Sequence, residues 1–195
     1  MKIRNILLAA TAISAASFSA NAKEIRPYIG FDAGGLFASY EHTSTGVAGD
    51  SLLEKDFLYA SPYVGVEFNK NVALEVGYFH TLEESKSFNG SLIGGTGTVT
   101  TDVKYHGFSI DAVGTYDLTD KFGVLGLVGV VFSEGDLTVS SGSITLGATE
   151  SETAAKGGVG FSYDITNNII ARTKAEYLAI GDGFATYSAG LQYKF

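Results

Sequence analysis

Apolar and polar side chains alternate with a period of two residues along most of the chain after residue 25. The final segment shows this most clearly, because Leu191, Tyr193 and Phe195 share one face while Gln192 and Lys194 fall on the other. Successive side chains of a β-strand point to opposite faces, so the alternation predicts a strand with one apolar and one polar face. In water, the free edge of such a strand would template aggregation. We therefore interpret it as the closing strand of a barrel whose apolar face contacts lipid.

Eight segments of this kind follow one another, separated alternately by tight turns and by longer polar stretches. No apolar run after residue 22 approaches the roughly 20 residues that a membrane-spanning helix needs. Short turns at one end and long loops at the other are typical of membrane barrels with both termini in the periplasm. The sequence therefore predicts an all-β fold, an eight-stranded antiparallel up-and-down transmembrane β-barrel. The predicted strands are residues 26–37, 57–68, 72–82, 102–116, 122–132, 154–163, 169–180 and 184–195, with loops at 38–56, 83–101 and 133–153 and a tight connection at 181–183.

The alternative is a soluble barrel that keeps its apolar side chains inside, around a ligand. Long loops at one end only and the terminal Phe195 argue against it. Aromatic residues near strand ends also favour a membrane barrel, because its interfacial girdle lies there. The predicted girdle is Tyr63, Phe68, Tyr78, Tyr116, Phe122, Tyr163, Tyr193 and Phe195. Residues 122–132 are apolar on both faces, so their facing stays ambiguous.

The first 22 residues have the organisation of a secretory signal peptide. Lys2 and Arg4 form a positive start, an apolar stretch follows, and Ala20 and Ala22 supply a small-residue cleavage site. The apolar stretch is too short for a transmembrane anchor. We expect residues 1–22 to be removed on export and residues 23–195 to form one outer-membrane barrel domain.

Charge and composition exclude several classes of function. The formal net charge of −8 becomes −10 once Lys2 and Arg4 leave with the signal peptide. A chain this acidic is not expected to bind nucleic acid. The absence of cysteine excludes disulfides, thiolate metal sites, a cysteine nucleophile and lipoprotein acylation.

Several segments resemble the OmpA-like and opacity-like outer-membrane β-barrel superfamily. The resemblance rests on residues 27–30 (PYIG), 62–68 (PYVGVEF), 73–78 (ALEVGY) and 189–195 (AGLQYKF), and it extends over the mature chain. It implies a location in the outer membrane of a Gram-negative bacterium. Members of the superfamily include adhesins, surface antigens, small channels and structural anchors, so the resemblance is specific for fold rather than function. We expect no cell-wall tether, because no peptidoglycan-binding domain follows the last strand in this sequence.

Nine charged residues fall on the polar faces of the predicted strands. Buried charges need partners, so the simplest interpretation is a structural network of ion pairs that plugs the interior. The alternative is a gate, in which an exchange of ion-pair partners opens a narrow ion channel. A wide pore is not expected, because a barrel of eight strands is filled by its own side chains. The nine residues are Asp32, Glu67, Glu75, Asp111, Lys156, Arg172, Lys174, Glu176 and Lys194.

The sequence predicts no enzymatic activity, no cofactor and no metal site. Some small outer-membrane barrels resemble enzymes that remodel lipid A with histidine and serine, and His42 and Ser44 have a suitable spacing. Both residues fall in the first long loop, away from the lipid. His80 and His106 flank the second loop, where they are expected to lie near each other at the rim. Two histidines without a third ligand do not make a metal site.

The long loops carry most of the net negative charge of the mature chain. We expect them either to shield the barrel mouth or to display a surface for a host or matrix protein, a basic protein rather than a polyanion. The polar runs at 94–101 and 140–145 are expected to be mobile or to extend hairpins. The loop acids are Glu41, Asp50, Glu54, Asp56, Glu83, Glu84, Glu134, Asp136, Glu150 and Glu152.

The sequence therefore predicts a monomeric surface-exposed adhesin or antigen, with a narrow ion channel or a purely structural role as alternatives. Outer-membrane lipid and lipopolysaccharide are the expected surroundings. The outer-membrane assembly machinery is a further expected partner, which would recognise Leu191, Tyr193 and Phe195 in the last strand.

Overall fold

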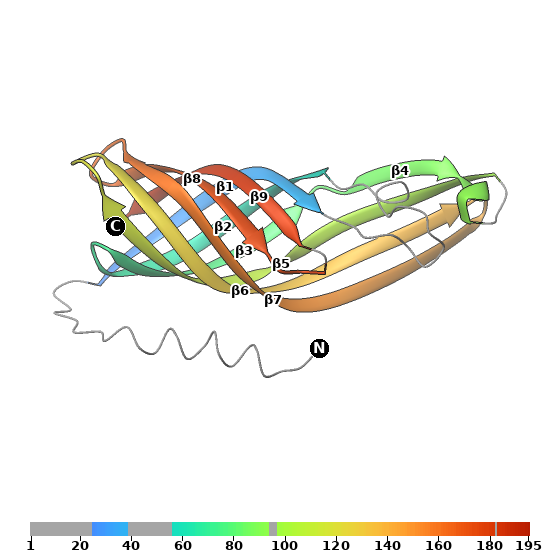
Figure 1. The fold of residues 1–195 in the computed structure, drawn as a ribbon, viewed down its shortest axis with the longest axis horizontal. Helices are drawn as coiled ribbons and strands as arrows, with labels where there is room; N and C mark the ends of the chain where they lie inside the picture. Colours follow the sequence, from blue (N-terminus) through green and yellow to red (C-terminus); the bar gives the residue numbers. More distant parts are fainter. Residues whose placement is uncertain (1–24, 39–55, 94–96, 182) are drawn as a thin grey trace.

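The computed structural model describes residues 25–38, 56–93, 97–181 and 183–195 (Figure 1). The predicted signal peptide with Ala20 and Ala22, and the first loop from residue 39 to 55 with His42 and Ser44, lie outside the described residues. No helix in the described part of the chain is long and apolar enough to cross a membrane.

The described strands form a closed ring of eight. In spatial order the ring is β3-β2-β1-β9-β8-β7-β6-β5, and it closes where β3 pairs with β5; β4 adds to the outer part of β5. Every pairing is antiparallel. The predicted fold class is therefore confirmed. The elements are β1 (Arg26–Ala38), β2 (Asp56–Asn69), β3 (Val72–Thr81), β4 (Glu84–Asn89), the 3₁₀ turn η3 (Gly90–Ile93), β5 (Thr98–Asp117), β6 (Phe122–Ser141), β7 (Ile144–Asp164), β8 (Ile169–Leu178) and β9 (Phe184–Lys194).

The two faces of the barrel strands follow the predicted alternation. In β9, Leu191, Tyr193 and Phe195 point outward with about half or more of their surface exposed, whereas Gln192 is buried in the lumen. Residues 122–132, whose facing the sequence left open, also alternate, with odd-numbered residues pointing inward and even-numbered residues pointing outward. The outer surface is therefore apolar around the ring, as contact with lipid requires.

The end opposite the termini differs from the sequence prediction. Residues 133–153, predicted as a loop, instead continue β6 and β7 as a hairpin that turns at Gly142, whose φ of 60° suits glycine. Within the second predicted loop, β4 pairs with residues 98–103 of β5. Together, β4 and residues 98–104, 134–141 and 144–152 form a four-stranded sheet beyond the barrel (Figure 1), called the protruding sheet below.

Two clusters of buried apolar residues lie inside the barrel on either side of a charged layer. The cluster nearer the termini contains Tyr28, Tyr63, Ala73, Val113, Leu125 and Leu127. The cluster nearer the protruding sheet includes Leu36, Phe57, Tyr59, Phe79, Val131 and Phe184. The charges between them are consequently buried, except where Glu75 and Arg172 line a cavity on the side of the termini.

Candidate functional site

Seven charged side chains in the middle of the lumen form one chain of alternating charge. Neighbouring groups lie 2.5 to 3.7 Å apart, measured from nitrogen to carboxylate oxygen. They come from five strands, so the ion pairs connect opposite walls of the barrel. Four acids alternate with three bases, and a carboxylate stands at each end. The order is Glu75, Arg172, Asp32, Lys174, Glu176, Lys156 and Asp111.

Arg172 is the most connected member of the chain. Its guanidinium donates two hydrogen bonds to the Glu75 carboxylate, Nη1 to Oε1 at 2.5 Å and Nη2 to Oε2 at 3.2 Å. Nη1 also donates to Gln192 at 3.1 Å, and Nη2 lies 3.6 Å from Asp32. Tyr28 donates its hydroxyl to Glu75 at 2.8 Å. A planar, paired arrangement of this kind is the strongest form of carboxylate recognition by arginine.

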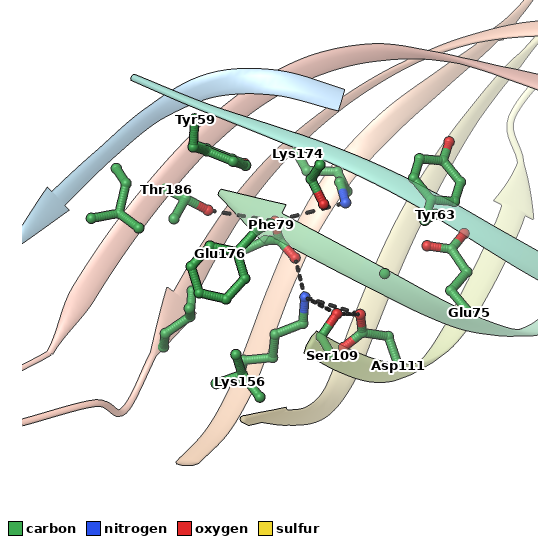
Figure 2. Close-up of a pocket in the computed structure, with 15 residues that line it drawn as sticks. Tyr59, Tyr63, Glu75, Phe79, Ser109, Asp111, Lys156, Lys174, Glu176 and Thr186 are labelled. Carbon is green, nitrogen blue, oxygen red and sulfur yellow. Dashed lines mark hydrogen bonds and ion pairs between the residues drawn. The ribbon is translucent and has the colours of Figure 1, made fainter. Parts of the chain in front are cut away.

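Lys156 connects the other end of the charge chain. Its Nζ lies 2.9 Å from Asp111 and 3.1 Å from Glu176, between β5 and β8 (Figure 2). Ser109 donates to Asp111 at 2.8 Å, which satisfies a further lone pair. Both contacts fall on Asp111 Oδ2, whereas Asp111 Oδ1 is buried without a hydrogen-bond partner among the described residues, so this end of the buried network is only partly satisfied.

The remaining two predicted lumen charges form a separate pair near the termini. Lys194 and Glu67 are ion-paired, and their side chains are 25% and 13% exposed. All nine charged residues that the sequence placed inside the barrel therefore point inward, and each has an ion-pair partner.

Tyr63 was wrongly predicted to belong to the interfacial girdle. It is 5% exposed and lies in the lumen, where the Arg172 guanidinium carbon is 4.4 Å from the centre of its ring. A cation over an aromatic face is a favourable electrostatic contact. Gly30 faces Tyr63 across the β1–β2 pair, and the ring fills the space that a side chain would take there.

Two cavities meet at Glu75. One, of about 40 Å³, lies among members of the charge chain, including Lys156 and Glu176, and apolar side chains such as Phe79 and Val131. The other, of about 210 Å³, opens toward the termini. Glu75 lines both. The Glu75 side chain therefore stands between two small cavities, and no wide channel connects them within the described residues.

The protruding sheet has two chemically different faces. The outer face continues the lipid-facing surface of the barrel, and the inner face continues the lumen. The outer face carries Ser85, Ser87, Thr100, Asp102, Lys104, Glu134, Asp136, Thr138, Ser140, Thr145, Thr149 and Ser151. The inner face carries the apolar side chains of Phe88, Val99, Val103, Leu137, Val139, Ile144 and Leu146, together with the charged Glu84, Lys86, Glu150 and Glu152.

The protruding sheet is acidic and has an exposed edge. Its four segments contain six acids and two lysines. Among the described residues, positions 144–151 of β7 pair with β6 only, because β8 begins to pair at Lys156. Ile144 and Leu146 on this edge are 64% and 67% exposed. An unpaired edge with exposed apolar residues is a template for binding another strand.

His80 and His106 lie opposite each other at the base of the protruding sheet, as the sequence suggested. Their ring centres are 6.1 Å apart, and His106 Nε2 is 3.3 Å from Glu134. Among the described residues, no three histidine or carboxylate side chains are grouped closely enough to hold a metal ion.

Asp136, on the outer face, offers a test of the geometry through its pKa. The hydrogen bond that Thr149 donates at 2.7 Å lowers the pKa of this carboxyl, and the positive charge of Lys104 lowers it further. Because the folded-state pKa is depressed, this stabilisation is present at neutral pH and is lost as pH falls through the folded-state value. We expect Thr149→Val to raise the pKa of Asp136 toward its ordinary value, measured by NMR titration of the side-chain carboxyl. Thr145→Val on the same strand should leave it unchanged; an unchanged pKa in Thr149→Val would contradict the assignment.

Comparison with known proteins places these features in context. A sequence-family model described as the OmpA-like transmembrane domain matches residues 22–193. Among curated protein sequences, none matches the chain. Solved structures do: neisserial surface protein A has a TM-score of 0.61 and 18% identity, with 87% of this chain and 97% of that chain covered.

Two further structures have similar folds. Ail, the attachment invasion locus protein of Yersinia pestis, has a TM-score of 0.55 and 19% identity over 88% of this chain and 97% of its own; one of its structures contains the heparin analogue sucrose octasulfate. A major outer membrane protein of Thermus thermophilus has a TM-score of 0.54 and 11% identity over 86% of this chain and 99% of its own. At these identities the likeness concerns the fold alone.

Proposed function

Because the chain belongs to the OmpA-like transmembrane domain family and is a barrel of the Gram-negative outer membrane, we propose that it is a surface-exposed adhesin or antigen that binds a partner protein through the protruding sheet. The observation that carries the proposal is the edge of β7 from Ile144 to Ser151, which pairs with no strand other than β6 in the part of the chain that the structure describes. The partner we propose is a host or matrix protein with a basic extended segment, because the sheet is acidic and opposite charges favour association.

The backbone of β7 determines which residues would receive a partner strand. Ala155 accepts a hydrogen bond from Ala179 on the β8 side at 2.9 Å. Backbone groups alternate between the two sides of a strand, so the odd-numbered residues from 145 to 151 direct their N–H and C=O groups toward the free edge. A segment that adds there would gain main-chain hydrogen bonds, with Glu150 and Glu152 close by for basic side chains.

We expect Gly147→Pro to abolish binding to host cells or matrix proteins. Proline removes an N–H that points to the free edge, while the bonds from β7 to β6 are kept. A side chain at position 147 has room, because the nearest atom, the Leu137 carbonyl oxygen, is 4.0 Å from its Cβ. The measurement is binding by bacteria that display each variant at equal surface density.

The matched control is Gly147→Ala, which adds a side chain but keeps the N–H. Binding lost in the proline variant and retained in the alanine variant supports addition of a strand to this edge. Equal binding by both variants would show that the edge is not used. Binding that also survives deletion of residues 134–152 would overturn the protruding sheet as the binding surface.

A second candidate function is a narrow ion channel, and the alternating charge chain that borders two small cavities in the lumen is the observation that favours it. Opening would require Arg172 to leave Glu75, for example for Asp32, which already lies 3.6 Å away. The same network, left closed, would serve a purely structural barrel. Conductance of the Arg172 variants described in the Discussion distinguishes the two.

The last strand is also proposed as the signal for the assembly machinery. Leu191, Tyr193 and Phe195 remain exposed on the lipid side and Tyr193 stacks edge-on against Phe195, with ring centres 5.3 Å apart. This aromatic end is available for recognition before β9 pairs with β1.

A further inference from the structure

The outer face of the protruding sheet is built in rows whose chemistry changes with distance from the barrel. Residues opposite one another in the register form each row. The first row is aromatic, with Tyr78, Phe108 and Phe132. The next two are charged, with His80, His106 and Glu134, then Lys104, Asp136 and Thr149. The following two are rich in hydroxyl groups, with Ser85, Asp102 and Thr138, then Ser87, Thr100, Ser140 and Thr145, and Asn89 and Thr98 pair beyond them.

The order of these rows matches the layers of a glycolipid leaflet. Aromatic side chains mark the boundary of the hydrocarbon, and here Tyr78 and Phe108 pack with ring centres 4.9 Å apart on the outer surface. Thr100 is eight residues beyond Phe108 on β5, a path of roughly 26 Å along an extended strand. The hydroxyl rows therefore stand beyond the acyl chains and the headgroups.

We propose that the hydroxyl rows are a docking surface for the saccharide of lipopolysaccharide in the protein's own membrane. The outer face of the protruding sheet is continuous with the lipid-contacting surface of the barrel, so neighbouring lipopolysaccharide molecules in the same leaflet can reach it. The row of Ser87, Thr100, Ser140 and Thr145 carries no charge and only hydroxyl side chains, which both donate and accept hydrogen bonds as sugar hydroxyls do.

The hydroxyl rows are ordered for this contact. Ser87 and Thr100 are hydrogen-bonded at 2.8 Å, and Ser140 and Thr145 at 3.3 Å. Each hydroxyl donates one hydrogen and accepts at two lone pairs, so each pair keeps further capacity for a sugar. This inference is independent of the proposed function, which uses the β7 edge rather than the outer face.

Adjacent serines give a matched test. Ser140 lies on the outer face and Ser141 on the inner face of β6. The chain has no cysteine, so Ser140→Cys and Ser141→Cys each introduce a single thiol. We expect a membrane-impermeant maleimide to label Ser140→Cys several-fold more slowly on cells with a complete lipopolysaccharide core than on cells with a truncated core. Labelling of Ser141→Cys should depend little on the core. Equal core dependence at both positions, or none at either, would overturn the proposal.

A second measurement tests the hydroxyl groups themselves. The purified barrel is reconstituted with complete-core or truncated lipopolysaccharide, and its thermal unfolding is compared. We expect the wild type to melt higher with the complete core, and the triple variant Thr100→Val, Ser140→Ala, Thr145→Val to lose that difference while melting normally with the truncated core. Identical melting of the wild type in both lipids would overturn the proposal. Binding of soluble glycans to the barrel that does not depend on the lipopolysaccharide core would also overturn it, because these rows would then belong to another ligand.

Discussion

Replacing Arg172 with methionine will destabilise the barrel by about 3–5 kcal/mol, the usual cost of removing one partner from a buried ion pair. The substitution removes the two hydrogen bonds that Glu75 accepts from the guanidinium, and it leaves Asp32 with Lys174 as its remaining ion-pair partner. Both carboxylates are less than 5% exposed, so the uncompensated charge stays largely out of bulk water. The free energy of unfolding is measured by urea titration of the refolded barrel. The chain has no tryptophan, so circular dichroism and gel mobility report the transition.

Lys194→Met is the control for this prediction. Lys194 also pairs with a lumen acid, Glu67, but it is partly exposed near the termini. Its loss should cost less than about 1 kcal/mol, as for pairs that water can screen. The double variant Arg172→Met, Glu75→Gln should recover part of the stability lost in Arg172→Met, since no uncompensated charge remains at position 75. Equal losses for Arg172→Met and Lys194→Met would contradict the central role of Arg172.

The same variants decide between the plug and the channel. If the network is a gate, Arg172→Met will raise the single-channel conductance in planar bilayers, because the layer between the two cavities loses its bridging side chain. If the network is a plug, the conductance will stay at the level of the wild type and only stability will fall. Lys194→Met should leave conductance close to the wild type in both cases.

Period-two alternation was sufficient to predict the barrel strands and the inward direction of the nine charges. Within the membrane, a charged side chain on the lipid face lowers the stability of the barrel by several kcal/mol. The alternation of apolar and polar positions is therefore kept along each membrane-spanning strand. Partner choice did not follow from the sequence. That Arg172 bonds Glu75, across the barrel and 97 residues away, depends on strand tilt and register.

Tyr63 shows how residue type can mislead where position is informative. Its aromatic ring and its distance from the strand end favoured the girdle, yet it lies four residues from Glu67, on the same face of β2. Residues four apart along a strand point to the same face, so the predicted inward position of Glu67 also implies an inward Tyr63. In this barrel, tyrosines lie on both the lumen face and the lipid face. The position of a residue in the alternation along its strand, rather than its residue type, predicts the face.

The protruding sheet was missed because its apolar face switches sides. In β6 the outward, even-numbered residues are apolar up to Phe132 and polar from Glu134 onward, while Leu137 and Val139 make the inner face apolar. The same change occurs in β5, between Phe108 and Lys104, and in β7, between Ala155 and Ser151. The strand continues, but its outward face leaves the hydrocarbon. A reversal of phase without a turn residue thus marks the membrane surface, although in the sequence the same pattern resembles the end of a strand.

Substituting Gly34 with alanine will prevent normal closure of the barrel. Gly34 lies on β1 opposite Ser188 of β9, in the pairing that joins the first and last strands. A Cβ at position 34 would overlap the carbonyl oxygen of Tyr187 and the Cα of Ser188. These are backbone atoms of the neighbouring strand, which cannot rotate away as a side chain can. The two strands must therefore separate, with loss of the hydrogen bonds that close the ring.

The matched control is Gly126→Ala, a glycine of β6 on the lipid side. Its Cβ would meet nothing closer than the Gly158 carbonyl oxygen at 4.0 Å. We expect Gly126→Ala to refold into the compact, heat-modifiable form at the wild-type yield, and Gly34→Ala to give little of this form. Because both variants make the same chemical change in a strand, differences in intrinsic strand preference cancel between them. Similar yields and similar unfolding free energies would mean that β1 and β9 do not approach each other this closely, and the register between the first and last strands would then have to be revised.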